Sequence, residues 1–467
     1  MCKFVSVNYL VGSSREQRLT EGRVSGLDRL TTGRTGIILV LALCLGLRLG
    51  LALYHSDDEL RSDAQDFVQI ACNIADGKGF SAGTSETGET HPSAHGYVIY
   101  PYFLAALLYV FNANLLGIFI VHSVIDTLTC WLVYCIARRF AGGSVAGLLA
   151  ALGYAVYPPL VLTTATAMTE TFNTFVMVAL SYVLIVAMRR GLWYYVPAGL
   201  MMGFAALSRP AMAAFPLVFA LLLYMRRRSI EAWMPKAALF VVCSVVAISP
   251  WTVRNYIMFH RFIPITTHFG MSFWGGTGPA DGVCLGGPGY PVDTKQRNLY
   301  DNPLVPDVSE KTYRRVTSFE ESLRSMNEVD RDMALRREAV SEIKQHPGRY
   351  AFLVVKKFFR LWFNMWHDHP ASAMSYGIAA LNALLLILAA LGLRLRTVDG
   401  ELKSFALAAW IYHTALYSII YATVRYSYPM MPLVIILAAA YVAAIVFRSP
   451  AKSQAPAGSV TVAAAAD

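Results

Sequence analysis

The acidic residues that follow the first apolar stretch are the chain's main candidates for acid–base chemistry. Residues 56–66 read SDDELRSDAQD and contain five carboxylates, those of Asp57, Asp58, Glu59, Asp63 and Asp66. If residues 60–75 form a helix, Asp63 shares one face with the apolar Phe67 and Ile70. A carboxylate that faces a helical bundle near membrane depth is a candidate functional residue. We therefore predict that Asp63 belongs to a site, whereas Asp57 and Asp58 remain solvated.

Two other acids lie within apolar stretches. Glu170, in the segment ATAMTETF, precedes an apolar run. It is either a second site residue or an acid favoured by the helix macrodipole, with Thr169 as the cap. Asp126, in HSVIDTLT, is expected to pair structurally with a polar neighbour inside the membrane.

Three arginines stand at the ends of apolar stretches: Arg209 in LSRP, Arg254 in PWTVRN and Arg425 in VRYSYP. One such arginine is commonly explained by its reach toward lipid headgroups. Three at one depth, opposite an acidic loop, favour an anion-binding site instead, because the guanidinium fork matches phosphate oxygens. Lys356 and Lys357, in KKFFR, are further candidates for the same anion.

The cysteine and histidine patterns predict no metal site. The seven cysteines show neither a CxxC motif nor the Cys/His spacing of a zinc site. The HDH triplet at residues 367–369 is better explained as an interface cap than as a metal ligand set. Cys72 and Cys284 are the only cysteines in the segments predicted to lie outside, where an oxidising compartment would permit a disulfide between them.

The composition places these residues in a membrane protein. The chain has 467 residues, 56% of them hydrophobic and 15% charged, whereas soluble domains carry roughly 25% charged residues. A span needs about 20 apolar residues. Ten candidates are 35–54, 115–137, 142–161, 171–188, 192–208, 211–225, 236–253, 374–394, 403–421 and 428–447. Residues 97–111 are short and suggest a re-entrant segment, and 350–366 suggest a helix that lies in the interface.

The distribution of basic residues predicts the topology. Ten spans put both termini on one side, and most arginines of the connecting segments fall on that side: Arg138, Arg139, Arg189, Arg190, Arg226, Arg227, Arg228, Arg394, Arg396 and Arg448. The positive-inside rule makes this face cytoplasmic. The net charge of +10 is therefore largely topological, and a nucleic-acid partner is not expected.

We therefore expect a cytoplasmic segment at 1–34, a membrane domain at 35–448 and a disordered cytoplasmic tail at 449–467. Within the membrane domain, segments 55–114 and 255–349 are expected on the outer, periplasmic face.

Several motifs, taken in order, resemble one family. These are DAQDF with ACNIADGKGFS, GYVIYPYFLA, TET, LSRP, SPWTVRNY with FIPITTHFG, EAVSEIKQHPGRY and RYSYPMMP. Together they resemble the bacterial protein O-mannosyltransferases and lipid A aminoarabinose transferases of glycosyltransferase family 39, over roughly residues 35–448. Phe67 stands where the family usually has Tyr, and HPSAHGY replaces a tighter Pro-Gly-Tyr-Pro pattern. These departures leave the acceptor open.

The resemblance implies an all-α integral membrane protein with a GT-C-type bundle of about 10–12 transmembrane helices, carrying periplasmic interfacial helices and loops. It implies a polyprenyl-phosphate-linked sugar as donor and co-substrate, no other cofactor, and an acceptor that is a glycan, a lipid or a protein. Carried over, Asp63 matches the catalytic acid of the first outer loop, Glu170 matches the acid of the second, and Arg425 contacts the lipid phosphate. Arg254, Arg209, Lys356 and Lys357 would assist at that phosphate.

These expectations amount to an inverting sugar transfer at the periplasmic face of the bacterial inner membrane, with Asp63 as general base. The alternative is a flippase for lipid-linked sugars or a secondary transporter, which would also place ionisable residues in a helical bundle. Transporters tend to show internal repeats and charges near the midplane, and this chain shows neither. A non-catalytic membrane scaffold would tolerate neutralisation of Asp63.

Overall fold

The protein is almost entirely helical. The computed structural model describes residues 34–55, 63–83, 90–112, 114–226, 229–277, 310–363 and 373–447. Asp57, Asp58, Glu59, Cys284 and the HDH triplet lie outside these ranges, so the predictions made for them stay predictions. The β-structure in the described part is one antiparallel pair, β1 (Ser81–Ala82) with β2 (His91–Pro92).

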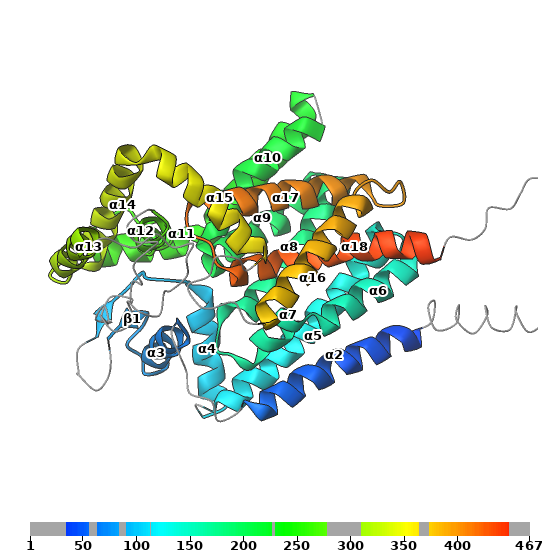
Figure 1. Ribbon diagram of the computed structural model, residues 1–467, viewed down its shortest axis with the longest axis horizontal. Helices are drawn as coiled ribbons and strands as arrows, with labels where there is room; N and C mark the ends of the chain where they lie inside the picture. The colour runs from blue at the N-terminus through cyan, green and yellow to red at the C-terminus, as the bar shows by residue number, and fades with distance from the viewer. Residues whose placement is uncertain are drawn as a thin grey trace, which may run out of the picture.

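The apolar helices form a bundle (Figure 1). They are α2 (Arg34–Tyr54), α5 (Leu115–Phe140), α6 (Gly143–Val156), α7 (Pro158–Leu162), α8 (Thr169–Arg189), α9 (Tyr195–Ser208), α10 (Phe215–Arg226), α11 (Ile230–Phe259), α16 (Ala373–Gly392), α17 (Gly400–Ile419) and α18 (Met431–Val446). The 3-10 segments η1 (Thr163–Ala165), η2 (Leu192–Tyr194), η3 (Pro210–Met212) and η6 (Val424–Met430) join or extend them. Each of the ten predicted spans coincides with one of these helices or helix pairs.

Six helices of the described chain are long and apolar enough to cross a membrane, and a bent pair makes a seventh. The bent pair joins Gly143–Val156 to Pro158–Ala165 at 55°. Its break has a local cause: Tyr157 precedes a proline and is extended, with φ −69° and ψ 110°, as steric conflict with the proline ring demands. The predicted all-α membrane fold is confirmed.

Small residues let two of the helices approach closely. Gly199 and Gly203 lie on the face of α9 that packs against α11. A Cβ at Gly199 would lie 2.5 Å from the Phe240 carbonyl oxygen, and one at Gly203 would lie 2.5 Å from that of Ser244. Such four-residue spacing of glycines is typical of helix pairs in membranes.

Asp126 has the structural partner that the sequence predicted. Its carboxylate accepts hydrogen bonds from Arg48 Nε and from the Tyr154 hydroxyl, and all three side chains are fully buried. Arg48 also donates to the carbonyl oxygens of Cys44 (3.2 Å) and Ala155 (2.9 Å). The ion pair therefore ties α2 to α5 and α6 and lets two charges remain buried.

The basic segments predicted to be cytoplasmic meet at one end of the bundle. Arg189 forms ion pairs with Asp399 and Glu401, and Arg226 forms one with Glu401. The Asp399 amide donates to the Phe140 carbonyl oxygen at 2.8 Å. In Figure 1, α2 begins and α18 ends on the right, whereas the helices at 63–75 and 310–345 lie on the left. Both ends of the described chain therefore lie on the same side.

The other end carries a layer of shorter helices. It comprises α3 (Asp63–Ala75), α4 (Ile99–Val110), α12 (Phe269–Gly275), α13 (Glu310–Leu323), α14 (Glu328–Gln345) and α15 (Pro347–Phe363). Trp274 of α12, Val316 and Leu323 of α13, and Leu335 and Ala339 of α14 form a separate small core. This layer packs over the helix ends that hold the predicted site residues.

Candidate active site

Three predicted site residues from distant parts of the chain meet at this end of the bundle. Arg425, in η6, donates through Nη2 to the Asp63 carboxylate. Its Nε lies 3.8 Å from Oε1 of Glu170, in the first turn of α8. The guanidinium of Arg425 therefore bridges two carboxylates, one at the start of α3 and one in the first turn of α8.

The packing of α3 sets the position of Asp63, the first residue of that helix. Phe67 and Ile70 are buried as the helical phase predicted, and the Phe67 ring lies 5.6 Å from the Tyr97 ring and 5.5 Å from the Tyr100 ring, between centroids. Asp63 itself remains partly exposed. Desolvation and the charge of Asp63 raise the pKa of the neighbouring Asp66.

Glu170 is a buried acid at a helix N-terminus, with 3% of its surface exposed. The cap of α8 differs from the prediction: the N-cap residue is Met168, and Thr169 already belongs to the helix. Among the described residues, Oε2 of Glu170 has no hydrogen-bond partner. Glu170 thus lies between the N-terminus of α8 and the guanidinium of Arg425, both of which carry positive charge.

Arg209 shares one aromatic neighbour, Tyr426, with Arg425 but has different hydrogen-bond partners. It is 3% exposed, and its Nε donates to the Tyr417 hydroxyl at 2.6 Å. Its guanidinium carbon lies 5.0 Å from the centre of the Tyr426 ring, and that of Arg425 lies 5.6 Å from the same ring. The two cations therefore share one aromatic neighbour, which lowers the cost of placing both near the bundle.

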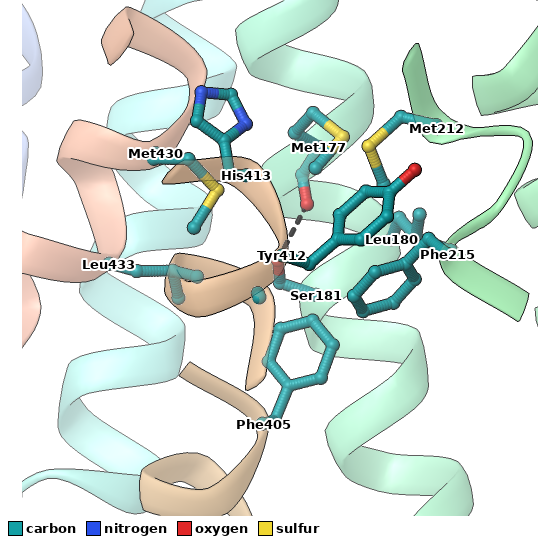
Figure 2. Close-up of a pocket in the computed structure, with 11 residues that line it drawn as sticks. Met177, Leu180, Ser181, Met212, Phe215, Phe405, Tyr412, His413, Met430 and Leu433 are labelled. Atoms are coloured by element: carbon teal, nitrogen blue, oxygen red, sulfur yellow. Dashed lines mark hydrogen bonds between the residues drawn. The ribbon is translucent and has the colours of Figure 1, made fainter. Parts of the chain in front are cut away.

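A cavity of about 260 Å³ opens next to Arg209. Its lining includes Tyr97, Arg209, His268, Ser272, Tyr417 and Tyr426. A second cavity, between α8, α17 and the start of α18, measures only about 10 Å³ and is drawn in Figure 2. That volume admits about one water molecule, so of these two cavities only the larger has room for a substrate group.

Two histidines that the sequence analysis did not single out form a pair at the site. His268 Nδ1 lies 2.9 Å from His95 Nε2, and one ring must donate the proton that the other accepts. Burial, with Arg331 nearby, lowers the pKa of His95 to about 4. Burial and the neighbouring His95 lower the pKa of His268 to about 3. Both imidazoles are therefore neutral near pH 7, and the charge of Asp63 acts on both.

Glu328, at the start of α14, joins the loops that hold this histidine pair. Its carboxylate accepts hydrogen bonds from the Ser93 hydroxyl (2.8 Å), the Ala94 amide (2.9 Å) and the Thr267 hydroxyl. His95 and His268 each directly follow one of these donors in sequence. Sequence periodicity does not predict contacts between residues 173 positions apart, so the histidine pair could not be predicted from the sequence.

Two of the other predicted phosphate binders, Arg254 and Lys357, donate hydrogen bonds to backbone carbonyl oxygens. Arg254 donates to the carbonyl oxygens of Ser93 (2.6 Å) and Phe80 (2.8 Å), which fastens the segment that carries β1 and β2 to α11. Lys357 Nζ donates to the carbonyl oxygens of Gly276 (2.8 Å) and Ile419 (2.8 Å). The structure thus gives both residues an architectural role, and phosphate contacts by either residue stay a prediction.

The sequence suggested an interfacial helix at 350–366, whose described part lies in α15, and its place in the interface stays a prediction. Lys356, Lys357 and Arg360 lie on one face as predicted, but all three are buried rather than displayed to lipid headgroups. The reason is that α15 packs against α16, α17 and η6.

Within the described residues no group of three or more His, Cys, Asp or Glu side chains could hold a metal ion, and Cys72 is a free thiol.

The described helices form an all-α, multi-spanning membrane protein with a GT-C-type fold. Residues 91–253, which are 163 of the 467 residues, match the sequence model of the dolichyl-phosphate-mannose-protein mannosyltransferase family. The predicted resemblance is thereby confirmed. A comparison with curated protein sequences finds no match.

Solved structures of an archaeal oligosaccharyltransferase have a similar fold. The apo oligosaccharyltransferase of Archaeoglobus fulgidus is similar with a TM-score of 0.51 and 12% identity, covering 89% of this chain and 51% of that one. The same enzyme, AglB, with an inhibitory peptide and dolichol-phosphate gives a TM-score of 0.50 and 12% identity, covering 88% and 50%. This chain thus spans about half the length of that enzyme. ArnT from Cupriavidus metallidurans, bound to undecaprenyl phosphate, gives a TM-score of 0.43 and 13% identity, covering 88% and 78%.

Proposed function

We propose that the protein is a glycosyltransferase. It moves a sugar from a polyprenyl-phosphate-linked donor to an acceptor hydroxyl at the periplasmic face of the bacterial inner membrane. The observation that carries the proposal is the bridge that Arg425 makes between Asp63 and Glu170, close to the tyrosine-lined cavity. The similar archaeal enzyme was solved with a dolichol-phosphate, which supports a lipid phosphate as the carrier.

In the proposed reaction, Asp63 acts as general base. The acceptor oxygen attacks the anomeric carbon as its proton passes to the Asp63 carboxylate, and the bond from that carbon to the phosphate oxygen breaks on the opposite side. The electron pair of the broken bond remains on the departing phosphate, and the configuration inverts. A positioned general base typically contributes about 10²–10⁴-fold to such a step.

The ion pair gives Arg425 a part in the same step. In the resting site its charge is matched by Asp63 and Glu170. Once Asp63 takes the proton, it no longer offsets Arg425, whose charge becomes available as negative charge grows on the phosphate. Donors already placed where charge develops are a main source of catalytic stabilisation. Proton uptake and phosphate departure would therefore be coupled through one guanidinium.

The test of this proposal compares two acids on α3. Purified protein in lipid vesicles is given polyprenyl-phosphate sugars, and release of the lipid phosphate is followed. Asp63→Asn retains the shape but cannot accept the proton, so turnover should fall about a hundredfold or more. Asp66→Asn, three residues further on and exposed, is the matched control and should retain turnover.

Two results would count against the proposal. Wild-type turnover in Asp63→Asn would show that Asp63 is not the general base. Movement of the intact donor across the bilayer with no released lipid phosphate would favour the flippase alternative.

A further inference from the structure

The histidine pair joins the wall of the larger cavity to the first turn of α3. His268 lines the cavity, and its Nδ1 lies 2.9 Å from Nε2 of His95. Next to His95, a Cβ on Gly96 would lie 3.9 Å from the ring of Phe67, which follows Asp63 by one helical turn. The charge of Asp63 acts on both histidines. The pair therefore connects the cavity with the surroundings of the proposed base.

The wall of the cavity does not include that base. Among the described residues that line the cavity, His268 is present and Asp63 is not. A general base must lie within hydrogen-bonding reach of the proton that it removes, directly or through one water molecule. For a hydroxyl bound in the cavity, a side chain of the wall that passes the proton on would meet the same requirement.

Contacts outside the pair hold the two rings in place. The His95 amide donates to the Ser93 hydroxyl (3.0 Å), and the His268 amide donates to the Thr266 hydroxyl (3.1 Å). The Ser93 hydroxyl in turn donates to Glu328 (2.8 Å), whose carboxylate also joins the two loops. The orientation of one ring toward the other is thus set by the loops that carry them.

Two neutral imidazoles in contact can pass a proton on without acquiring net charge. Each neutral ring has one N–H group and one unprotonated nitrogen. When His268 donates through Nδ1, its Nε2 is unprotonated, and His95 carries its own N–H at Nδ1. A proton taken up at Nε2 of His268 can then displace the shared proton to His95, which releases its Nδ1 proton. Burial lowers the pKa of both histidines and so disfavours a charged ring, which favours transfer through neutral tautomers.

We infer that His268 and His95 form a proton relay from the cavity to Asp63. The inference rests on the proposed function in taking the proton from the acceptor hydroxyl. As the hydroxyl oxygen bonds to the anomeric carbon, its proton passes to Nε2 of His268. The Nδ1 proton of His268 passes to Nε2 of His95, and the Nδ1 proton of His95 passes to the Asp63 carboxylate.

The relay step is balanced in atoms and charge. The bond from the anomeric carbon to the phosphate oxygen breaks, and the phosphate retains the electron pair. The hydroxyl loses one proton and the Asp63 carboxylate gains one. Both rings end neutral, each in the opposite tautomer, and proton exchange with water at Nε2 of His268 and Nδ1 of His95 resets them.

The decisive variant preserves the hydrogen bond and removes the relay. In His95→Gln the side-chain amide can take the position of Nε2 and bond to His268, but it has no second nitrogen through which a proton could leave. Release of lipid phosphate from undecaprenyl-phosphate sugars is followed for the full-length chain in lipid vesicles. In His95→Gln, kcat should fall about a hundredfold, with KM near the wild-type value.

Two further variants accompany this measurement. His91→Gln, at an exposed position of β2, is the matched control and should release lipid phosphate at the wild-type rate. If His95→Gln does not fold, His268→Asn interrupts the relay at the other ring, because its amide can replace Nδ1 but supplies no nitrogen at the position of Nε2.

Solvent isotope effects distinguish a relay from a structural role. In mixtures of light and heavy water, a step that moves several protons gives a rate that curves with the deuterium fraction, whereas a step that moves one proton gives a straight line. The wild type should give a curve and His95→Gln a straight line. Loss of a merely structural contact would lower the rate without changing the shape of the plot.

A second measurement does not depend on sugar transfer. The relay requires the two tautomers of the pair to interconvert at least as fast as turnover, which is roughly 1 s⁻¹ at the low end for enzymes. Nitrogen NMR of isotopically labelled histidine follows this exchange in the wild type, and His95→Gln and His268→Asn assign the signals. A single tautomer that does not exchange on this time scale would overturn the inference.

Each outcome decides the inference. Slower release in His95→Gln with a straight isotope plot, together with exchanging tautomers in the wild type, supports the relay. Wild-type release in His95→Gln, or in His268→Asn where only that variant folds, would overturn it, and so would equally curved plots. Absence of release by the wild type would refute the proposed function, and tautomer exchange would still decide whether the pair can carry a proton.

Discussion

At the scale of single residues, two pairs of side chains without net charge organise the site. Asp63 and Arg425 form an ion pair, and His95 and His268 form a hydrogen bond between neutral rings. Because burial lowers the pKa of both histidines, the pair is neutral at the pH at which the carboxylate and the guanidinium are charged. His95 and His268 therefore add no positive charge near Asp63 that would compete with Arg425.

The histidine pair makes stability depend on pH in a defined window. The unfolded chain regains the ordinary histidine pKa near 6.5, whereas the folded pKa values are about 4 and about 3. Below pH 6.5 the unfolded state therefore binds more protons, and the free energy of unfolding falls as the pH drops toward 4. His268→Gln should make this fall shallower, as measured by unfolding midpoints between pH 7.5 and 4.5.

His91→Gln supplies the matched control for that measurement, because His91 is an exposed residue on β2. This variant should retain the wild-type slope. Equal slopes in the wild type and His268→Gln would show that the pair does not titrate between the folded and unfolded states as we expect.

At the scale of elements, α12 is fixed by close backbone contact with the end of α17. A Cβ on Gly276 would lie 1.7 Å from the Ile420 carbonyl oxygen, so Gly276→Ala must push the segments apart. It would also disturb the Lys357 hydrogen bond to the Gly276 carbonyl oxygen. We expect destabilisation of about 1–3 kcal/mol, the usual range for overpacking, measured as a lower unfolding midpoint.

The neighbouring glycine offers a control one position away. A Cβ on Gly275 would lie 3.8 Å from the Tyr421 ring, an ordinary van der Waals contact. Gly275→Ala should therefore leave the midpoint nearly unchanged. Equal losses in the two variants would mean that the contact with Ile420 is not what limits substitution here.

Glu328 connects elements that the sequence analysis treated separately. Glu328→Gln removes the charge that accepts hydrogen bonds from Ser93, Ala94 and Thr267, and hydrogen bonds to charged groups contribute roughly 1.5–3 kcal/mol. We expect amide hydrogen exchange to speed up about tenfold or more at residues 90–98 and 266–277. Glu321→Gln, an exposed acid on α13, should leave those rates unchanged. Acceleration in both variants would argue against a specific clamp.

Sequence patterns predicted the parts of the site that depend on local rules. Helical phase put Asp63 on the face of Phe67 and Ile70. The ends of apolar runs placed Arg425 at one depth with Arg209 and Arg254, and Glu170 at the start of another run. The carbonyl contacts of Arg254 and Lys357 could not be predicted in this way. They depend on how irregular segments far apart in the chain pack together, and neither composition nor periodicity records such contacts.

At the scale of the whole molecule, the two ends of the bundle have opposite character. One end joins Arg189 and Arg226 to acids of the segment 394–402, and the other carries α3, the histidine pair and the cavity. A Lys/Arg-rich end is retained in the cytoplasm. The proposed function needs the opposite end to face the periplasm, where a flipped lipid-linked sugar would be presented.

The orientation is tested by single cysteines at the two ends. Ser325→Cys adds an exposed thiol between α13 and α14, and Thr397→Cys adds one between α16 and α17. In intact cells, a thiol reagent that does not cross the inner membrane should label Ser325→Cys above the parent protein but not Thr397→Cys. Both should be labelled once the cells are opened, which controls for reactivity. Labelling of Thr397→Cys alone in intact cells would show that the topology is the reverse of the predicted one, with the basic end facing outward. The carboxylate of Asp63 would in that case face the cytoplasm, and a periplasmic sugar transfer by this site would be ruled out.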